Sequence, residues 1–208
     1  MAERKSSEQR REQIIGATQR IVARKGFASV TLRDVATEVG IAHGLIRHYF
    51  ASRDELVAAA FDHAVTAELA SDEQLLAGLE PIAALAAWFS TTPEDHSLVW
   101  VDAWSEAPRN PALATALERH HRDCERILAD VIRRAVAAGA ASSADVDADS
   151  RMLTALADGM AVQHHAIRIV DARAADEIVF GAVEARLAIA PGSLAQADRA
   201  PARGQWLG

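Results

Sequence analysis

Apolar residues recur at helical spacing along most of this chain, and the most specific pattern lies in residues 31–50. Thr31 is a typical helix N-cap, and Gly40 suits the residue at which a helix ends. A second short helix is predicted over residues 42–48, and two short helices around a glycine turn indicate a helix-turn-helix. The apolar stripe of the first helix has i, i+3, i+4, i+7 spacing and consists of Leu32, Val35, Ala36 and Val39.

The second of these short helices has an apolar side and a polar side. Leu45, Tyr49 and Phe50 are predicted to face inward. In a helix-turn-helix the outward surface of the second helix enters the major groove of DNA, so we expect DNA as the partner. The residues left on that outward surface are His43, Gly44, Arg47 and His48.

The rest of the chain has no alternating, strand-like pattern of any length, which predicts an all-α fold. A first helix is expected over Arg10–Lys25, and another begins after Ser52, a favourable N-cap. Pro81 should kink its helix or make it start late. From Pro191 the periodicity is lost, so residues 191–208 are expected to be a disordered tail. Further helices are expected over Leu75–Phe89, His96–Glu106, Pro111–Ala138, Ala148–Val170 and Ala174–Ile189.

Charge is distributed unevenly along the chain. The net charge is −7, yet residues 1–60 hold ten Lys or Arg against seven Asp or Glu, and the remainder carries −10. Only the N-terminal part therefore has the sign that displaces counterions from DNA phosphates. The acidic remainder would repel DNA and so help to orient the molecule on it.

Sequence features that direct a protein to a membrane or out of the cell are missing from this chain. The N-terminal residues are charged and offer no apolar signal core, and no run of eighteen apolar residues exists to span a bilayer. The single cysteine, Cys124, excludes a disulfide within the chain and fits a reducing compartment. We therefore expect a cytoplasmic protein with no membrane partner.

Residues 10–60, about a quarter of the chain, resemble the DNA-binding domain of TetR-family transcriptional repressors. Three positions depart from the family pattern: Ala42 where the family often has Ser, Arg47 where it usually has Tyr, and Arg53 where it usually has Lys. The positions that match are Ala17, Gly26, Phe27, Thr31-Leu-Arg-Asp-Val-Ala, Gly40-Ile, Gly44, His48-Tyr-Phe, Ser52 and Asp54-Glu-Leu.

This resemblance implies a helix-turn-helix DNA-binding domain over residues 1–53 and a helical effector-binding and dimerisation domain over residues 54–190. The protein would then be a dimeric repressor that a small-molecule effector releases from a palindromic operator. The operator sequence does not follow from the resemblance. A helical scaffold or partner-binding protein that retains a helix-turn-helix is the alternative function.

Contacts with double-stranded operator DNA are expected in and beside the second short helix. Arg47 replaces an aromatic contact by a cation that could reach a guanine edge or a phosphate, and Arg53 would face the DNA backbone. Arg10 and Arg11 of the first helix are either simply solvated or placed to meet a phosphate. The full set of expected contacts is Thr31, Arg33, Ala42, His43, Gly44, Arg47, His48, Tyr49 and Arg53.

A homodimer interface is expected on the last two long helices. Small and apolar residues there would allow two helices to pack closely against their own copies. The segment Ala155-Leu-Ala-Asp-Gly159 resembles a signature of the TetR-family dimer bundle, and the alternative is that these positions belong to the monomer core. The expected interface residues are Ala155, Gly159, Gln163, Phe180, Val183 and Leu187.

Three of the four tryptophans, together with apolar residues from other predicted helices, could line an effector cavity. The alternative is ordinary core packing, because aromatic residues at helical spacing usually belong to the core. The C-terminal half resembles the branch of the family that includes the choline-sensing regulator BetI. An aromatic cage would suit a quaternary ammonium, so the expected effector is small and apolar or amphipathic, with a cationic head as one option. The expected lining is Trp88, Phe89, Trp100, Trp104, Met152, Leu156, Met160, Gln163 and His164.

Enzymatic and metal-binding functions find little support in the sequence. Glu118 and His121 form one Glu-x-x-His motif, whereas a di-metal carboxylate bundle needs two such motifs and two further glutamates. His120 and His121 are adjacent on a helix and point in different directions. Cys124 lacks the signals of an oriented base and an oxyanion site. We expect neither a catalytic activity, nor a metal, nor a cofactor.

Overall fold

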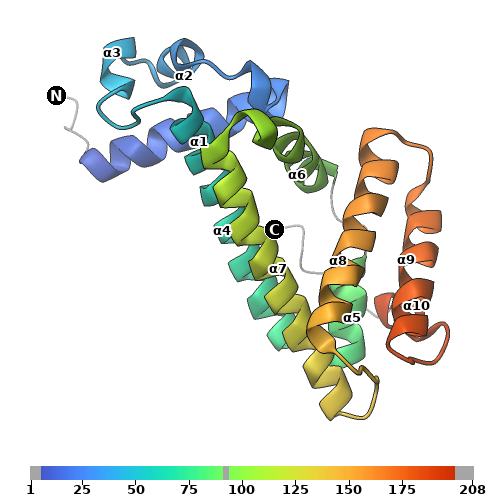
Figure 1. Ribbon diagram of the computed structural model, residues 1–208. Coiled ribbons are helices and arrows are strands. Elements are labelled where there is room, and N and C mark those ends of the chain that lie inside the picture. Colours follow the sequence, from blue (N-terminus) through green and yellow to red (C-terminus); the bar gives the residue numbers. More distant parts are fainter. Residues whose placement is uncertain (1–5, 91–93, 200–208) are drawn as a thin grey trace. The chain divides into compact units, whose positions relative to one another are not determined.

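The computed structural model of this protein describes residues 6–90 and 94–199. Within these ranges the chain is helical and has no strand, which confirms the all-α prediction. Short 3-10 helices follow α1 and α6 (Figure 1). The helices of the described residues are α1 Ser7–Lys25, α2 Leu32–Val39, α3 His43–Ile46, α4 Arg53–Ala77, α5 Pro81–Phe89, α6 Glu94–Glu106, α7 Pro111–Ala137, α8 Val146–Ala161, α9 Ala172–Arg186 and α10 Ser193–Asp198.

The chain divides into two compact units. The first consists of residues up to 68 together with 98–120, and the second of residues 69–97 together with those from 121 onward. Helices α4, α6 and α7 therefore contribute to both units. These bounds differ from the functional division expected at residue 53, because most of α6 and the first turns of α7 pack with the N-terminal helices.

Helix α1 begins earlier than its apolar pattern predicts. Ser6 caps it by accepting a hydrogen bond from the backbone N–H of Gln9, and the Gln9 side chain accepts one from the Ser6 N–H in return. This reciprocal capping box lets polar residues start the helix before the first apolar position. The buried face of α1 includes Ile14, Ala17 and Ile21, which are at most 2% exposed.

The caps predicted for α2 are confirmed. The Thr31 hydroxyl accepts a hydrogen bond from the Asp34 N–H at 3.1 Å, and Gly40 adopts the left-handed conformation with φ of 73°. Helix α3 is shorter than the predicted range 42–48. The N–H groups of His48 and Tyr49 reach back only three residues, because the chain turns there to bury Phe50, which is 1% exposed.

The boundary between α4 and α5 follows the expectation for Pro81. The Ser52 hydroxyl accepts from the Glu55 N–H at 3.0 Å, which confirms Ser52 as the cap of α4. Helix α4 then ends at Ala77, and α5 starts late, with Pro81 in its first turn. At the end of α4 the backbone oxygen of Leu76 accepts a hydrogen bond from the Leu79 N–H at 3.2 Å and a second one from Arg134 at 2.8 Å, which strengthens the C-terminal turn of the helix.

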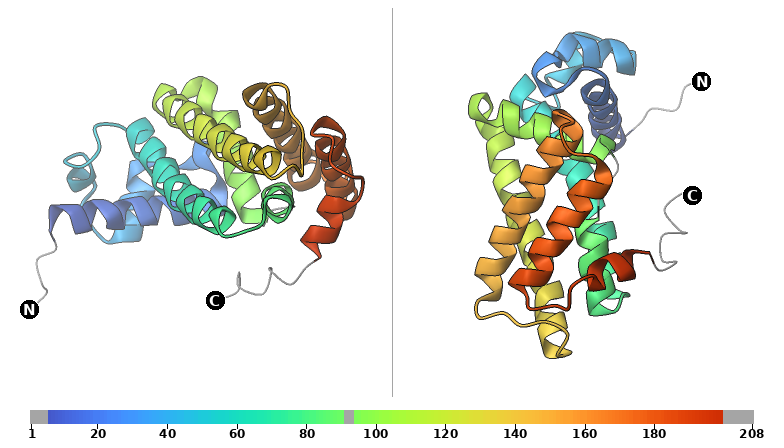
Figure 2. Two further views of the ribbon diagram at one scale, coloured as in Figure 1. Left: turned by 90° about the horizontal axis from the view of Figure 1, so that it is seen from below. Right: turned by 90° about the vertical axis from the view of Figure 1, so that its right-hand side faces the viewer.

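Helix α8 ends nine residues before the predicted end at Val170. It continues as one π-helical turn over Val162–Ala166, and the chain then passes through Arg168, whose φ is 54°. Because a residue with positive φ cannot continue a right-handed helix, α8 cannot extend to Val170. Helices α8 and α9 then lie side by side in the second unit (Figures 1 and 2).

The expectation of a disordered tail is wrong for residues 191–199. Leu194 of α10 is fully buried, and the backbone N–H groups of Gly192 and Leu194 each donate at 2.8 Å to the carboxylate of Glu184. Glu184 is itself only 6% exposed, so these hydrogen bonds fix the start of α10 against α9. Helix α10 also packs on α5 (Figure 2). Residues 200–208 lie outside the described residues.

Candidate functional site

The exposed residues of α3 and of the turn after it form a surface that we call the helix-turn-helix surface. It consists of His43, Gly44, Arg47 and His48, all of which are exposed as predicted. Beneath it Ile46 is fully buried and Phe50 nearly so, whereas Leu45 and Tyr49 are only partly buried. Ile46 is a buried core residue of α3 that was not among the residues predicted to face inward, although it follows Ile41 and Leu45 in the same apolar pattern.

Arg47 is the cation of this surface with the greatest reach. It is the C-cap residue of α3 and is exposed, and among the described residues its side chain makes no ion pair. Arg33 of α2 is exposed as well. Ala42, the N-cap residue of α3, provides no side-chain hydrogen bond, as expected from its missing hydroxyl.

Thr31 and Tyr49 lie close to the helix-turn-helix surface but differ from the residues that form it. The Thr31 hydroxyl donates to the Asp34 carboxylate at 2.7 Å and accepts from the Asp34 N–H, so its only proton is used within α2. We therefore assign Thr31 a capping role rather than a DNA contact. Tyr49 is partly buried and remains a proposed contact.

The basic residues in the second half of α1 are neutralised by α2. Arg20 and Arg24 pair with Glu38 at 3.2 and 2.8 Å. Hydrogen bonds from Arg24 and then Arg20 hold the pKa of Glu38 below its ordinary value. Lys25 pairs with Asp34 at 2.7 Å and, together with Thr31, lowers the pKa of that carboxyl group. These cations join α1 to α2 and are less available to DNA.

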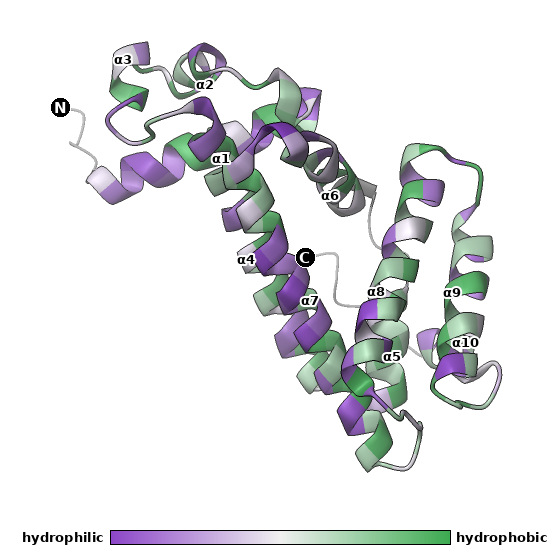
Figure 3. Cartoon of the chain, in the orientation of Figure 1, coloured by the Kyte–Doolittle hydropathy of each residue, from purple (hydrophilic) through white to green (hydrophobic). Residues whose placement is uncertain are grey.

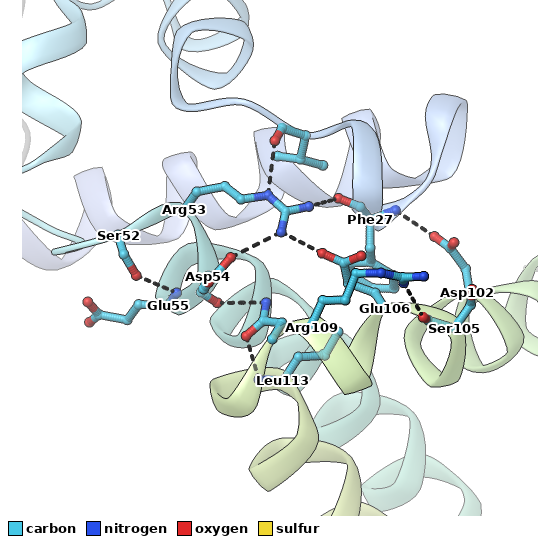
Figure 4. A network of polar contacts seen from close by, with 12 residues as sticks. Phe27, Ser52, Arg53, Asp54, Glu55, Asp102, Ser105, Glu106, Arg109 and Leu113 are labelled. Atoms are coloured by element: carbon cyan, nitrogen blue, oxygen red, sulfur yellow. Dashed lines mark hydrogen bonds and ion pairs between the residues drawn. The ribbon is translucent and has the colours of Figure 1, made fainter.

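Arg53 is turned toward the protein, contrary to the expectation that it faces the DNA backbone (Figure 4). Its guanidinium donates to Glu106 at 2.6 Å, to Asp54 at 3.0 Å and to the backbone oxygen of Val30 at 3.2 Å. A further hydrogen bond reaches the backbone oxygen of Phe27. The Glu106 side chain is only 7% exposed, so the pair is held in a partly desolvated setting. We therefore withdraw Arg53 from the expected DNA contacts.

A second acidic residue of α6 contacts the same turn. The Asp102 carboxylate accepts a hydrogen bond from the Phe27 N–H at 2.5 Å (Figure 4). Glycine suits position 26 for two reasons, because its φ is 77° and a Cβ there would make a tight 3.0 Å contact with an Asp102 carboxylate oxygen. Asp102 and Glu106, which the sequence analysis did not select for this role, thus fix the segment that leads into α2.

The residues expected to line an effector cavity fall in different compact units. Trp100 and Trp104 belong to the first unit, where their rings lie 6.0 Å apart and Trp100 packs edge-on against Phe61 at 5.3 Å. Of the other residues, Phe89 and Met160 are buried, whereas Met152 is 46% exposed, which argues against a place inside a cavity. The remaining partly buried residues, all in the second unit, are Trp88, Leu156, Gln163 and His164.

A group of ionisable side chains joins α7 to α8 within the second unit. His121 lies 3.9 Å from Glu125 on its own helix and 3.9 Å from Asp158 on α8. Burial raises the pKa of Asp158 from 3.8 to about 6, with the Glu125 charge adding to the rise and the His121 charge opposing it. His121 therefore lies against two carboxylates, one on each of the two helices.

An Asp158→Asn substitution is expected to raise the free energy of unfolding at pH 8. The pKa is higher in the folded state, so the folded protein binds more protons between about pH 4 and 6 and loses stability as the pH rises through that window. Because 33% of the side chain is exposed and solvent screens the charge, we expect a gain of about 1 kcal/mol. Thermal unfolding at pH 8 and pH 4 would measure it, and an equal gain at both pH values would contradict the explanation.

Half of the expected dimer residues are buried within the protomer. Phe180 is 5% exposed, and Val183 and Leu187 are fully buried, so the prediction that they meet a second copy is wrong. The apolar side of α9 that carries them packs within the second unit. Ala155 and Gly159 of α8 are exposed, and Gln163 is partly so.

Neither a metal site nor a membrane span is found in the part of the chain that the structure describes. No group of three or more His, Cys, Asp or Glu residues there is arranged to hold a metal ion. His120 instead contacts Asp62 at 2.7 Å, which links α7 to α4 in the first unit. No helix among the described residues is long and apolar enough to cross a membrane.

Comparison with protein families gives two matches that together cover most of the chain. Residues 14–60 match the model of bacterial regulatory proteins of the TetR family. Residues 82–188, about half of the chain, match the model of the C-terminal domain of BetI-type transcriptional repressors.

Individual curated relatives agree with these models. A BetI regulator from Paraburkholderia phymatum is 32% identical over 114 residues, which cover 51% of this chain and 58% of the relative. A BetI regulator from Burkholderia mallei is 29% identical over 163 residues, or 73% and 79% of the two chains. The regulator PksA from Bacillus subtilis is 43% identical over 51 residues, which are 24% of this chain and only 25% of PksA.

Solved structures share the fold over nearly their whole length. A transcriptional regulator from Saccharomonospora viridis in complex with choline has a TM-score of 0.76 and 23% identity, covering 88% of this chain and 98% of that one. A TetR regulator from Haloarcula marismortui has a TM-score of 0.74 and 21% identity, with coverages of 86% and 99%. At these identities the likeness establishes the fold.

Proposed function

Because this chain belongs to the TetR family of transcriptional regulators, with a BetI-type C-terminal domain, we propose that it is a homodimeric repressor that a small molecule releases from a two-fold operator. The family is one of regulators rather than enzymes or scaffolds. Operator binding would place the protein in the cytoplasm with the DNA.

The helix-turn-helix surface is the observation that carries the DNA-binding part of this proposal. Its four residues are exposed while Ile46 and Phe50 are buried beneath them, so the surface is presented to an outside partner on a packed base. Arg47 is the proposed base-reading residue, because a guanidinium can donate two hydrogen bonds to a guanine edge. Contacts from Arg33, Ala42 and Tyr49 are proposed around it.

Dimerisation is proposed through one face of α8 and α9, which we call the dimer face. Its members repeat every three or four residues on each helix and are all exposed in the protomer. Small residues allow two helix backbones to approach closely, and the exposed Met152 and Ile178 add apolar area. A dimer is needed because one short α3 contacts too few base pairs for specificity. The dimer face consists of Met152, Ala155 and Gly159 on α8 and Ile178, Gly181 and Ala185 on α9.

The proposed effector is a small amphipathic molecule with a cationic head. The choline bound to the Saccharomonospora viridis regulator supports this class. Asp158 and Glu125 in this chain supply negative charge, and the partly buried Trp88 could supply an aromatic face. Effector and operator would each weaken the other by the same factor, because both shift one equilibrium between two states.

Arg47→Ala is expected to change which DNA sequences the protein prefers. Loss of a bidentate contact to one base pair should cost about 1–3 kcal/mol on the best operator and much less on operators mutated at that base pair. Binding of the wild type and the variant to a set of single-base operator variants would measure this. An equal loss on every operator variant would instead assign Arg47 to a phosphate.

A further inference from the structure

We propose that Arg11 of α1 is a DNA-backbone contact, held beside the helix-turn-helix surface by the ring of Phe50. The guanidinium carbon of Arg11 lies 5.0 Å from the centre of that ring. Phe50 is only 1% exposed and follows His48 by two residues, so its ring is a fixed platform attached to the end of the helix-turn-helix surface. The proposal rests on the DNA-binding function proposed above.

The chemistry of arginine suits this position. A guanidinium is flat and can lie with one face on an aromatic ring while the N–H groups at its edge stay free for a phosphate. Arg11 is exposed, and it makes no ion pair within the ranges that the structure describes. The platform therefore reduces the freedom of the side chain without neutralising its charge, and such preorganisation favours binding.

The other basic residues of α1 are engaged elsewhere. Arg20 and Arg24 pair with Glu38, and Lys25 pairs with Asp34. Arg10, the neighbour of Arg11, donates to the side-chain oxygen of Gln13 at 2.9 Å and is partly buried. Although the first turns of α1 carry several hydrophilic residues (Figure 3), the contacts single out Arg11 as the cation of α1 available to an anionic partner.

The salt dependence of DNA binding tests this assignment. Each phosphate contact contributes about 0.9 to the slope of log K against log salt, so Arg11→Gln should flatten the slope by about that amount. The same flattening is expected on a genomic fragment that the protein selects and on a random duplex, because a backbone contact reads no sequence. Arg10→Gln is the matched control and should leave the slope unchanged.

An Arg11→Lys variant separates the charge from the platform. Lysine keeps the charge but stacks less well on a ring, so the slope should stay near that of the wild type while the affinity falls about threefold. Thermal unfolding of each variant should match the wild type, since Arg11 is exposed.

Three results would overturn the proposal. The first is an unchanged slope for Arg11→Gln, and the second is a loss confined to the selected fragment, which would indicate a base contact. The third is an equal flattening by Arg10→Gln. A wild-type protein that binds neither duplex at low salt would contradict the DNA-binding function itself, and this proposal with it.

Discussion

Arg53→Ala is expected to lower the free energy of unfolding by about 3 kcal/mol, the cost of breaking a partly buried ion pair. The substitution leaves the carboxylate of Glu106 buried without its cation and removes hydrogen bonds to the backbone oxygens of Phe27 and Val30. These atoms hold the segment that leads into α2, so the variant should also bind DNA more weakly. Denaturant unfolding followed by circular dichroism would measure the loss.

Two further variants make this prediction specific. Arg53→Lys keeps the charge but cannot reach two carboxylates and two carbonyls with one ammonium group, so it should lose about 1–2 kcal/mol. Arg109→Ala is the matched control, because Arg109 is exposed and its one hydrogen bond to the described residues goes to the backbone oxygen of Ser105. If Arg53→Ala were as stable as the wild type, the ion pairs and hydrogen bonds of Arg53 would contribute nothing to the free energy of unfolding, and the prediction would be wrong.

Gly159→Glu is expected to dissociate the proposed dimer with little change to the protomer. The substitution places a carboxylate from each copy in the proposed dimer face, where burying it without a partner should cost several kcal/mol, or more than about 100-fold in affinity. The protomer has room, since nothing lies within 4 Å of an added Cβ at Gly159, and Glu favours helix more than Gly does. The molar mass from sedimentation equilibrium would report the change.

Operator binding should fall with the dimer in this variant, because a monomer carries only one helix-turn-helix surface. Ala70→Glu provides the control, since it adds the same charge at an exposed position of α4 that is not part of the dimer face. A Gly159→Glu protein that remains a dimer would exclude the face proposed for α8 and α9.

Local signals in the sequence predicted the DNA-binding helices well. Thr31 and Gly40 act on residues only three or four positions away, so their types are enough to predict the ends of α2. The exposed positions of α3 followed from spacing alone. The length of α3 did not, because the burial of Phe50 ends the helix, and that depends on tertiary packing.

The failed predictions concern partners that lie far along the chain. The sequence marks Arg53 as a basic residue next to a DNA-binding motif, but its carboxylate partner Glu106 comes 53 residues later. Likewise Val183 and Leu187 have the apolar spacing of a packed face, and spacing cannot tell whether the same protomer or a second copy covers it. The residues around Leu194 have no apolar periodicity, so the sequence did not predict α10. The backbone N–H of Leu194 is held by a hydrogen bond to the buried carboxylate of Glu184.

The central claim is that two copies of the helix-turn-helix surface read one two-fold DNA site. Sequencing the genomic fragments that the purified wild-type protein retains at moderate salt tests it most directly. The account predicts that the retained fragments share an inverted repeat, with its half-sites about one or more DNA turns apart. Retention without a shared sequence, or a shared sequence without two-fold symmetry, would contradict it.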